Sequence, residues 1–581
     1  MESSGKFAAL AAALAASVAV AAPVAAGGNA VERIVEAPPV WSGFGEWPTE
    51  PPADCPFPRS ETFRGVSFTS RHVEYARADT WYPSWASDGN MYSPWTDGWV
   101  GKTRCGSGGR NAATGHATIV GDDPMNLKIV DEGVFKSDPS PYNGRYPCGS
   151  LVYNGVWYYG TYCLAPSGFV RKDGQIYNWP FLGPFVGFRW SVDYGKTWNQ
   201  TPCTPAKPLF GESGLDGAPV KIGVPCFIDF GRNMEHSPDG KAYLVVQGSS
   251  DGKNRRYGYN SWITADQVFL IRVEPSIENM NDASKYEFYA GRGRDGKAVW
   301  TRDFAKIAPL LEWRDRMGRV SATYDPALRK YLMCVTDGGT TVSRYNTYIL
   351  EADEPAGPWK LAAYLKDFGE QAYFVNIPSK FIDKKDGRTM WLCYSANFSC
   401  GSMSQLYRSV PAGGGYRMCL QEFRLVGRDE APAAKTAGAS ALLSAANLAR
   451  TAKVRASSVH KGYTAEAAAD GAVAGWPGDA AAEWASDLER ERAFIRLDWD
   501  KPQKVSRIQL FDRPNDIDRI LSGRLVFGDG SSIPVSALPD GGGKGLEISF
   551  PQRTVGWLMF TVDEVKGSTQ NAGLAEIAVF E

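Results

Sequence analysis

The sequence predicts an all-β protein with two domains, a β-propeller that is followed by a β-sandwich jelly roll. Three observations predict this architecture. The chain has 581 residues, more than one ordinary hydrophobic core organises. Between residues 60 and 427, short runs of Val, Tyr, Trp, Phe and Thr alternate with Gly, Asp, Asn and Pro, and helical periodicity is scarce. Beyond an Ala-rich segment at residues 428–446, short apolar strand patterns resume.

The chain begins with an Ala-rich apolar run over residues 7–26, which ends in Val24-Ala25-Ala26. Such a run before small residues is typical of a secretion signal that is cut after Ala26. We therefore expect a signal peptide at residues 1–26 and a mature protein that is secreted, extracellular or periplasmic. Because no other segment is long and apolar enough, we expect no membrane span after cleavage.

Composition restricts the partners. The formal net charge is -1, so the sequence shows no basic surface of the kind that binds nucleic acid. The protein is expected to be a monomer. All ten cysteines precede residue 420, and an even set in an oxidising compartment favours disulfides. The absence of CxxC spacings and the presence of only four histidines argue against a structural zinc site.

Hairpin signals recur through residues 60–427. Residues 85–92, 151–159 and 237–245 each place strand residues around an Asp-Gly or Asn-Gly turn, and residues 320–333 show a similar pattern. These signals recur at roughly 40 to 70 residue intervals, which is the repetition that a propeller requires. Five blades fit best, while a β-helix or an array of sandwiches remains open.

Residues 190–198 carry the pattern S-x-D-x-G-x-T-W, the Asp-box found at turns between outer strands of sialidase-like propeller blades. Asp193 is expected to accept backbone N–H bonds, Gly195 to supply a permissive backbone, and Trp198 to pack between strands. This motif supports the fold and not a catalytic site.

Residues 447–581 form the predicted second domain, after the linker of residues 428–446. The segments Lys453–Ser458, Asp470-Gly471, Trp484–Ser486, Val505–Leu510 and Gly573–Phe580 follow one another in the order of a discoidin-like, coagulation-factor type C domain, which the region resembles. The resemblance implies a galactose-binding-like jelly roll. It places three residues in loops that bind sugar in relatives: His460, Trp476 and Arg513.

The candidate catalytic residues lie in the first hairpin of the propeller region. If the chain reverses at residues 88–90, antiparallel pairing brings Asp79 nearly opposite Asp97, roughly 5 Å away between Cα atoms. One carboxyl can then protonate a leaving oxygen while the other acts as base or nucleophile. The neighbouring Trp81 and Trp95 are predicted to pack on sugar faces.

Residues 65–425 resemble the propeller family catalogued as domain of unknown function 4185, some of whose members are endo-acting D-arabinanases. Asp79 and Asp97-Gly98 carry this resemblance together with scaffold segments: residues 268–273, 286–291, 320–324, 330–333 and 357–359, and Trp300. The resemblance implies a five-bladed glycosidase. The family's usual G-D-T is replaced here by Thr96-Asp97-Gly98, which weakens the transfer of a role to Asp97.

Further candidates come from a second cluster and from isolated arginines. Glu235 is a candidate third carboxylate, and His236 beside it is a candidate base or substrate donor. Arg71 and Arg145 are predicted to bind hydroxyls or a uronate carboxylate.

The function predicted from these residues is a secreted glycoside hydrolase that acts on a polysaccharide or oligosaccharide. Asp79 is its predicted base or nucleophile, and Asp97 or Glu235 its acid. No cofactor is required, and bound calcium remains open, as does the identity of any metal ligand. Two alternatives stay open: a polysaccharide lyase that uses His236 with a Tyr, and a non-catalytic glycan-binding protein.

Overall fold

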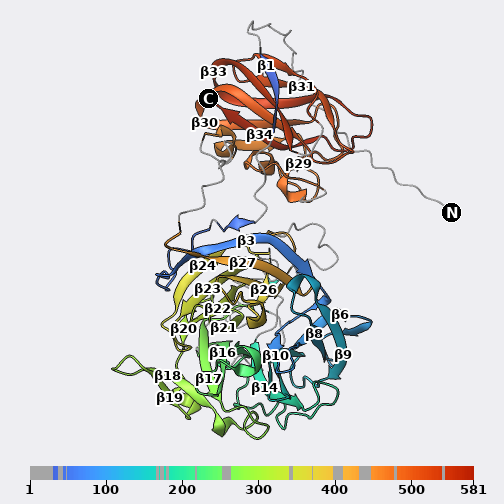
Figure 1. Cartoon of the computed structure of the whole chain (residues 1–581). Helices are drawn as coiled ribbons and strands as arrows, with labels where there is room; N and C mark the ends of the chain where they lie inside the picture. The colour runs from blue at the N-terminus through green and yellow to red at the C-terminus, as the bar shows by residue number, and fades with distance from the viewer. Residues whose placement is uncertain are drawn as a thin grey trace, which may run out of the picture. The chain divides into compact units, whose positions relative to one another are not determined.

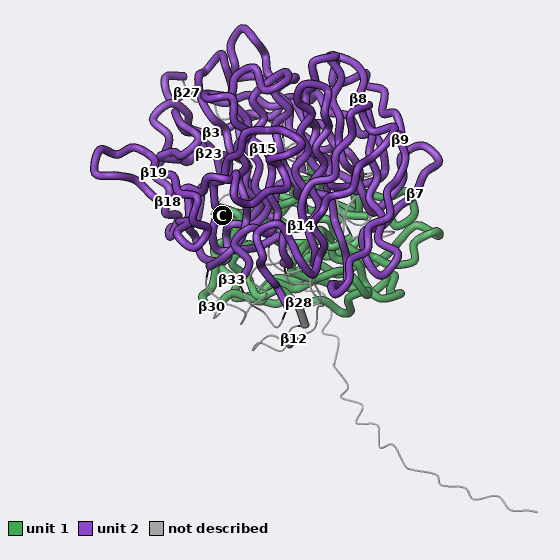
Figure 2. Tube along the Cα trace, turned by 90° about the horizontal axis from the view of Figure 1, so that it is seen from below, with its two compact units in different colours: residues 1–40, 436–581 green, residues 41–435 purple. Residues whose placement is uncertain are grey.

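The computed structural model describes residues 30–36, 44–47, 49–164, 169–170, 176–177, 182–215, 219–250, 263–338, 344–369, 371–396, 410–430, 442, 446–476, 480–539 and 543–581. The chain forms two compact units (Figure 2). Unit 1 comprises residues 1–40 and 436–581, and unit 2 comprises residues 41–435. The predicted signal peptide lies outside the described residues, as does most of the predicted linker.

The all-β class is confirmed. Within the described ranges the regular structure consists of strands, and helical structure is limited to short 3-10 segments: η1 (Pro124–Asn126), η3 (Arg232–Met234), η5 (Ala283–Lys285), η6 (Phe304–Lys306), η7 (Ser379–Phe381), η9 (Leu448–Thr451), η10 (Glu466–Ala469) and η11 (Ala480–Ala482). None of these helices has the length and apolar character to cross a membrane.

Unit 2 is built from antiparallel groups of strands that follow chain order. Two sheets come first: β4 (Arg77–Asp79), β5 (Ser84–Trp85), β6 (Met91–Val100), β7 (Thr103–Cys105), β8 (Ala113–Val120) and β9 (Lys128–Lys136), then β10 (Gly144–Tyr153), β11 (Val156–Leu164) and β14 (Leu182–Ser191). A small sheet pairs β12 (Phe169–Val170) with β13 (Ile176–Tyr177).

A ten-stranded sheet follows, in which two groups are joined through a parallel pairing of β15 with β21. Its strands are β15 (Val224–Asp229), β16 (Ala242–Gly248), β17 (Gln267–Val273), β18 (Glu287–Arg292), β19 (Ala298–Thr301), β20 (Leu311–Glu312), β21 (Val320–Asp325), β22 (Lys330–Asp337), β23 (Asn346–Ala352) and β24 (Lys360–Leu365).

The last sheet of unit 2 joins strands from both ends of the unit. It contains β2 (Gly45–Glu46), β3 (Phe63–Glu74), β25 (Tyr373–Asn376), β26 (Thr389–Ser395) and β27 (Cys419–Gly427). Because β3 pairs with β27, the beginning of the unit closes onto its end. In Figure 1 the strand groups succeed one another around unit 2 in chain order.

Three of the four predicted hairpins occur where expected. Trp85 pairs with Met91 across the turn at residues 88–90, and Tyr153 pairs with Val156. Residues 320–333 form the β21–β22 hairpin, whereas residues 237–241 are a turn that precedes only one strand, β16.

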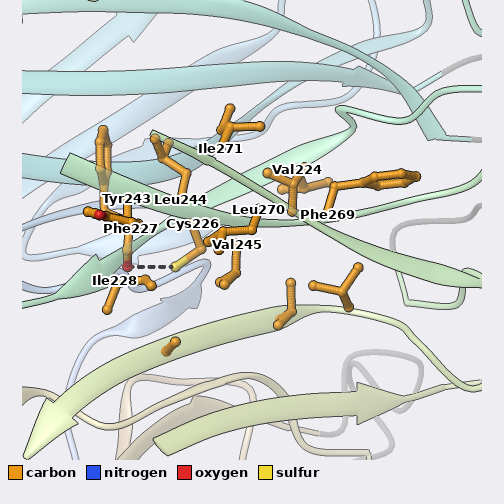
Figure 3. Close-up of a cluster of buried hydrophobic side chains, with 14 of the residues drawn as sticks. Val224, Cys226, Phe227, Ile228, Tyr243, Leu244, Val245, Phe269, Leu270 and Ile271 are labelled. Carbon is orange, nitrogen blue, oxygen red and sulfur yellow. Dashed lines mark hydrogen bonds between the residues drawn. The ribbon is translucent and has the colours of Figure 1, made fainter. Parts of the chain in front are cut away.

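The core of unit 2 packs against both faces of its sheets. Successive residues of β15, β16 and β17 are buried, including Val245, Phe269 and Leu270, which are 0 % exposed (Figure 3). Strands that are covered on both faces lack the alternation of apolar and polar residues. This is why the sequence pattern gives short apolar runs and does not tell which face of a strand is exposed.

The Asp-box forms the predicted turn after β14. The Asp193 carboxylate accepts the amide of Thr197 at 2.9 Å and its hydroxyl at 2.6 Å, and Gly195 adopts a φ of +93°. The Trp198 ring packs 5.1 Å from Trp157. The structural role predicted for this motif is confirmed.

The predicted disulfides are not supported. The nine described cysteines are all free, and seven of them are buried: Cys105, Cys148, Cys163, Cys226, Cys334, Cys393 and Cys419. Burial raises the pKa of these thiols, Cys105 to about 12 for example, which opposes formation of the thiolate. Here the cysteines act as small apolar side chains of the core.

Unit 1 is one eight-stranded antiparallel sheet. Its strands are β1 (Val31–Glu36), β28 (Lys453–Ala456), β29 (Trp484–Ala485), β30 (Phe494–Asp512), β31 (Ile520–Phe527), β32 (Ser532–Val535), β33 (Lys544–Val565) and β34 (Gly573–Phe580). The first of them, β1, pairs with β33 from Val31 opposite Ser549 to Glu36 opposite Lys544. The sequence did not predict a strand at residues 31–36.

A buried carboxyl makes the stability of unit 1 depend on pH. Glu576 is 0 % exposed. Burial raises its pKa to about 9, although the hydrogen bonds that it accepts from the Gly471 amide and from Asn447 act to lower the pKa. The folded unit therefore holds a proton that the unfolded chain releases above about pH 4.5, so the free energy of unfolding falls as pH rises toward 9.

Replacement of Glu576 by Gln is expected to remove this dependence. The variant should be about 2 to 3 kcal/mol more stable than the parent near pH 6.5 and equal to it near pH 4. Pulse proteolysis in urea, with fragments of unit 1 quantified by mass spectrometry, measures the difference. The matched control is Glu564→Gln at an exposed position of β33; equal effects of both changes at pH 6.5 would contradict the assignment.

Candidate functional site

The β4–β6 pairing brings Asp79 and Asp97 together, with a register that differs slightly from the predicted one. Asp79 lies opposite Thr96 and Arg77 opposite Trp99, with an irregularity between them. A methyl group at Gly98 would collide with the carbonyl of Arg77, so glycine lets β4 approach this closely. Asp79 therefore lies opposite the residue before Asp97 and not opposite Asp97 itself.

Asp79 is buried, with 7 % of its surface exposed. One carboxylate oxygen accepts the Thr80 hydroxyl at 2.9 Å, and the other accepts the hydroxyls of Tyr373 at 3.0 Å and Tyr416 at 3.2 Å. Burial raises the pKa of Asp79 well above its usual range, and the nearby charge of Asp97 raises it further. The hydrogen bonds from the three hydroxyls lower the pKa of Asp79, but by less than burial and Asp97 raise it.

Asp97 differs from Asp79 in its partners. It accepts the backbone amide of Ser107 at 2.7 Å. Burial raises its pKa, while the Ser107 amide and the Thr96 hydroxyl lower it. Two neighbouring carboxyls do not both ionise readily, so the pair favours a state in which one of them keeps a proton.

A pocket of ≈ 610 Å³ opens onto Asp97. This volume lies in the usual range of ligand sites. The lining residues come from β3, β4, β6, β7 and the segment before β27: Glu74, Arg77, Asp97, Gly98, Trp99, Arg104, Cys105, Gly106, Gly414, Gly415, Tyr416 and Arg417. Asp97 lines the pocket directly, and Tyr416, which also lines it, donates to the buried Asp79 behind it.

Tyrosines surround the two carboxyls, and the sequence analysis missed their role. In addition to Tyr373 and Tyr416, burial and the charges of both aspartates raise the pKa of Tyr146 and Tyr162. The rings of these two tyrosines lie 5.7 Å apart. The four tyrosines come from different segments of the chain and have the pattern of ordinary core residues, so no local sequence signal marks them.

Arg319 is a buried cation near Asp79. It is 2 % exposed, and none of its side-chain nitrogens has a hydrogen-bond partner within the described part of the chain. Its guanidinium lies 4.7 Å from the Phe374 ring and 5.3 Å from the Tyr82 ring. Burial lowers the pKa of Arg319, and the charge of Asp79 acts in the opposite direction.

Four residues predicted to bind substrate have other roles. Trp81 is 1 % and Trp95 0 % exposed, so neither ring offers a face to a sugar, contrary to the prediction. Arg71 forms an ion pair with Glu422 at 2.5 Å. Arg145 donates to the Thr161 hydroxyl at 3.0 Å, and burial lowers its pKa. None of the four lines the pocket at Asp97.

Glu235 and His236 lie in a separate pocket of ≈ 330 Å³ that shares no lining residue with the first. Trp85, which lines this second pocket, pairs with Met91 on β6. Met91 is six residues from Asp97 along that strand, a span of about 20 Å. The structure therefore does not bring Glu235 to the aspartate pair as a third carboxylate, because η3 places it beside the other end of β6.

In unit 1 the predicted sugar-binding residues lie on loops that one buried arginine holds together. His460 is 2.8 Å from the Asp487 carboxylate and its ring lies 5.7 Å from Tyr463. Trp476 is 38 % exposed, and its amide donates to Glu483. His460, Tyr463 and Trp476 therefore offer accessible side chains on linked loops.

Arg513 is that buried arginine and is only 2 % exposed. It donates to Glu483 at 2.8 Å, to Asp518 at 2.6 Å and to the carbonyl of Asn571 at 2.9 Å. Because the guanidinium donates these hydrogen bonds within unit 1, the predicted contact of Arg513 with sugar is not supported.

A metal site is not evident in the parts of the chain that the structure covers, where no three His, Cys, Asp or Glu side chains gather closely enough to hold an ion.

Comparison with known proteins gives a family match for part of the chain. Residues 447–580 match the family described as a domain of unknown function, DUF7402. No curated protein matches the chain.

Several solved structures are similar to parts of it. The family 32 carbohydrate-binding module of Clostridium perfringens NanJ, solved with galactose, is 17% identical, with a TM-score of 0.19; the match covers 23% of this chain and 96% of that chain. A proposed hydrolase from Bacteroides ovatus is 13% identical, with a TM-score of 0.36, over 66% of this chain and 96% of that chain. A protein described as a glycoside hydrolase is 12% identical, with a TM-score of 0.27; the match covers 87% of this chain and 99% of that chain. The similar structures thus include carbohydrate-binding modules and hydrolases.

Proposed function

We propose that the protein is a secreted glycoside hydrolase that acts on a polysaccharide through Asp79 and Asp97. The observation that carries the proposal is a pair of neighbouring carboxyls with different partners and with both pKa values raised: Asp79 is buried, and Asp97 lines a ≈ 610 Å³ pocket. Glycosidases need one protonated and one ionised carboxyl at the scissile bond. A shared proton at this site meets that need.

The fold in this proposal is a five-bladed propeller. Its support is the series of antiparallel groups β4–β9, β10–β14, β15–β18, β21–β24 and β25–β27, the last of which is completed by β3. Closure by an early strand lets radial sheets form a ring without a long free edge. The aspartates belong to the first group of this series.

The protonated member of the pair is assigned to Asp79. Its pKa is raised by burial and by the charge of Asp97, so Asp79 is the carboxyl that keeps the proton and gives it to the leaving glycosidic oxygen as the C–O bond breaks. Asp97, ionised and held by the Ser107 amide, takes a proton from the attacking water or bonds to the anomeric carbon. This reverses the roles expected from sequence.

Tyr373 and Tyr416 position Asp79 through their hydroxyls. The two carboxyls and water suffice for the reaction, so no organic cofactor belongs to the proposal. Unit 1 is proposed to hold the polymer through His460, Tyr463 and Trp476, while unit 2 cleaves it.

A lyase is the second candidate function. His236 lies in the ≈ 330 Å³ pocket with its ring 5.8 Å from Tyr324, which supplies the histidine and tyrosine that β-elimination from a uronic acid uses.

A polysaccharide screen with two readouts tests the proposal. The purified protein is expected to release new reducing ends without the ultraviolet absorbance of unsaturated uronates. Products that absorb would replace the hydrolase with the lyase. Binding without any product would leave a glycan-binding protein.

A further inference from the structure

Three side chains form a row on the wall of the Asp97 pocket. Arg77 on β4 lies opposite Trp99 on β6, and Trp99 lies opposite Arg104 on β7. Residues directly opposite each other in antiparallel strands project from the same face of a sheet, with Cβ atoms about 5 Å apart. All three line the pocket. We call them the Arg-Trp-Arg row.

The row adjoins the reacting carboxyls. Trp99 is two residues from Asp97 on β6, as Arg77 is from Asp79 on β4, and Asp97 lines the same pocket as the row. The backbones of β4 and β7 flank β6, so the two arginines start about 10 Å apart with Trp99 between them. A molecule that contacts the row therefore extends from the aspartate pair.

The charges of the row are uncompensated. Neither Arg77 nor Arg104 forms an ion pair with a described carboxylate, and both are exposed. The third arginine of the pocket, Arg417, is paired with Glu74 at 3.1 Å. Three arginines, Arg77, Arg104 and Arg417, and two carboxyls, Glu74 and Asp97, line the pocket, so its wall is net positive even when Asp97 is ionised.

Trp99 supplies an apolar surface between these charges. Its side chain is 49 % exposed, although the Arg104 guanidinium lies 5.7 Å from the ring centroid. An aromatic ring that remains half exposed inside a ligand-sized pocket offers a surface for the C–H face of a sugar.

We propose that the pocket selects an acidic glycan, in which a carboxylate or sulfate group on a sugar beside the scissile bond is bound by Arg77 and Arg104 while the sugar contacts Trp99. The inference rests on the proposed function and names its substrate class. Guanidinium groups recognise such planar or tetrahedral anions through charge-assisted, often bidentate hydrogen bonds. A neutral glycan would leave both charges without a partner.

Binding measurements on the full chain test the substrate class. The probes are oligosaccharides of polygalacturonate, which carry carboxylates, of a sulfated galactan, and of an unsubstituted galactan. The double variant Arg77→Gln, Arg104→Gln is expected to bind at least one acidic probe about tenfold or more weakly, the scale of losing charge-assisted bonds, with no change for the neutral probe. Its affinity should also depend less on salt concentration.

The matched control is Arg294→Gln, an exposed arginine between β18 and β19 that lines no part of the pocket. It should leave all affinities unchanged. The acidic probe that loses affinity in the double variant identifies the anion as carboxylate or sulfate. Both substitutions lie in unit 2 and leave unit 1 unchanged, so a difference between parent and double variant is attributed to the pocket of unit 2.

Two results separate this inference from the proposed hydrolase. Cleavage of neutral glycans, equally fast in the parent and the double variant, would overturn the acidic substrate and leave the hydrolase standing. Arginine-dependent binding of an acidic probe without cleavage of any glycan would overturn the hydrolase and support the site. If both acidic probes bind the double variant as tightly as the parent, the inference is overturned directly.

Discussion

Asp97→Asn is expected to lower hydrolysis of a cleaved polysaccharide by at least ~100-fold, because an amide neither accepts a proton from water nor attacks the sugar. Asparagine keeps an oxygen that accepts the Ser107 amide, so the hairpin should stay folded. Asp79→Asn should cause a loss of similar size, because the amide has no acidic proton to give to the leaving oxygen. Initial rates with circular dichroism as the folding check measure both.

The pH dependence tests which aspartate is the acid. In the parent, activity should fall at low pH as Asp97 is protonated and at high pH as Asp79, with its raised pKa, loses its proton. In Asp79→Asn the residual activity should lack the alkaline limb. Near-normal turnover in Asp79→Asn, together with an unsaturated product that disappears in His236→Ala, would replace the hydrolase with the lyase.

Arg513→Met is expected to destabilise unit 1 by about 3 to 5 kcal/mol, the cost of leaving buried charges without their partner. The change removes the ion-pair partner of Glu483, which is 0 % exposed, and of Asp518, which is 6 % exposed. Methionine has a similar volume, so the effect reports charge more than a cavity. Pulse proteolysis of unit 1 fragments in urea measures it.

The matched control for Arg513 is Arg524→Met, which removes an exposed ion pair to Asp563 at 2.8 Å in the same unit. Exposed pairs contribute about 1 kcal/mol or less, so this variant should stay close to the parent. Equal destabilisation by the two changes would show that Arg513 is not the residue that holds the loops together.

The aspartate pair could be predicted because it is a local feature. The turn at residues 88–90 sets the pairing of β4 with β6, and the register missed by one position because Gly98 allows an irregularity that the sequence alone does not reveal. The Asp-box was predictable for the same reason, since its hydrogen bonds join residues within a few positions of one another.

The rest of the site could not be predicted because it joins distant segments. Tyr373 and Tyr416 reach Asp79 across 294 and 337 residues of sequence. The first six residues of β6 are all buried, so their pattern gave no reason to prefer Trp99 over Trp95 as the accessible aromatic residue. Arg513 was expected at the surface because its partners come from other loops.

The pairing of β1 with β33 makes unit 2 an insertion within unit 1. Val31 pairs with Ser549, which is synthesised 518 residues later. At typical rates of protein synthesis this delay is roughly 25 to 100 s. All strands of unit 2 have emerged well before then, so unit 2 can fold while β1 is still unpaired. Unit 1 is completed last, and its closure tethers unit 2 at both ends. One proteolytic cut in either connection therefore leaves the two units attached to each other.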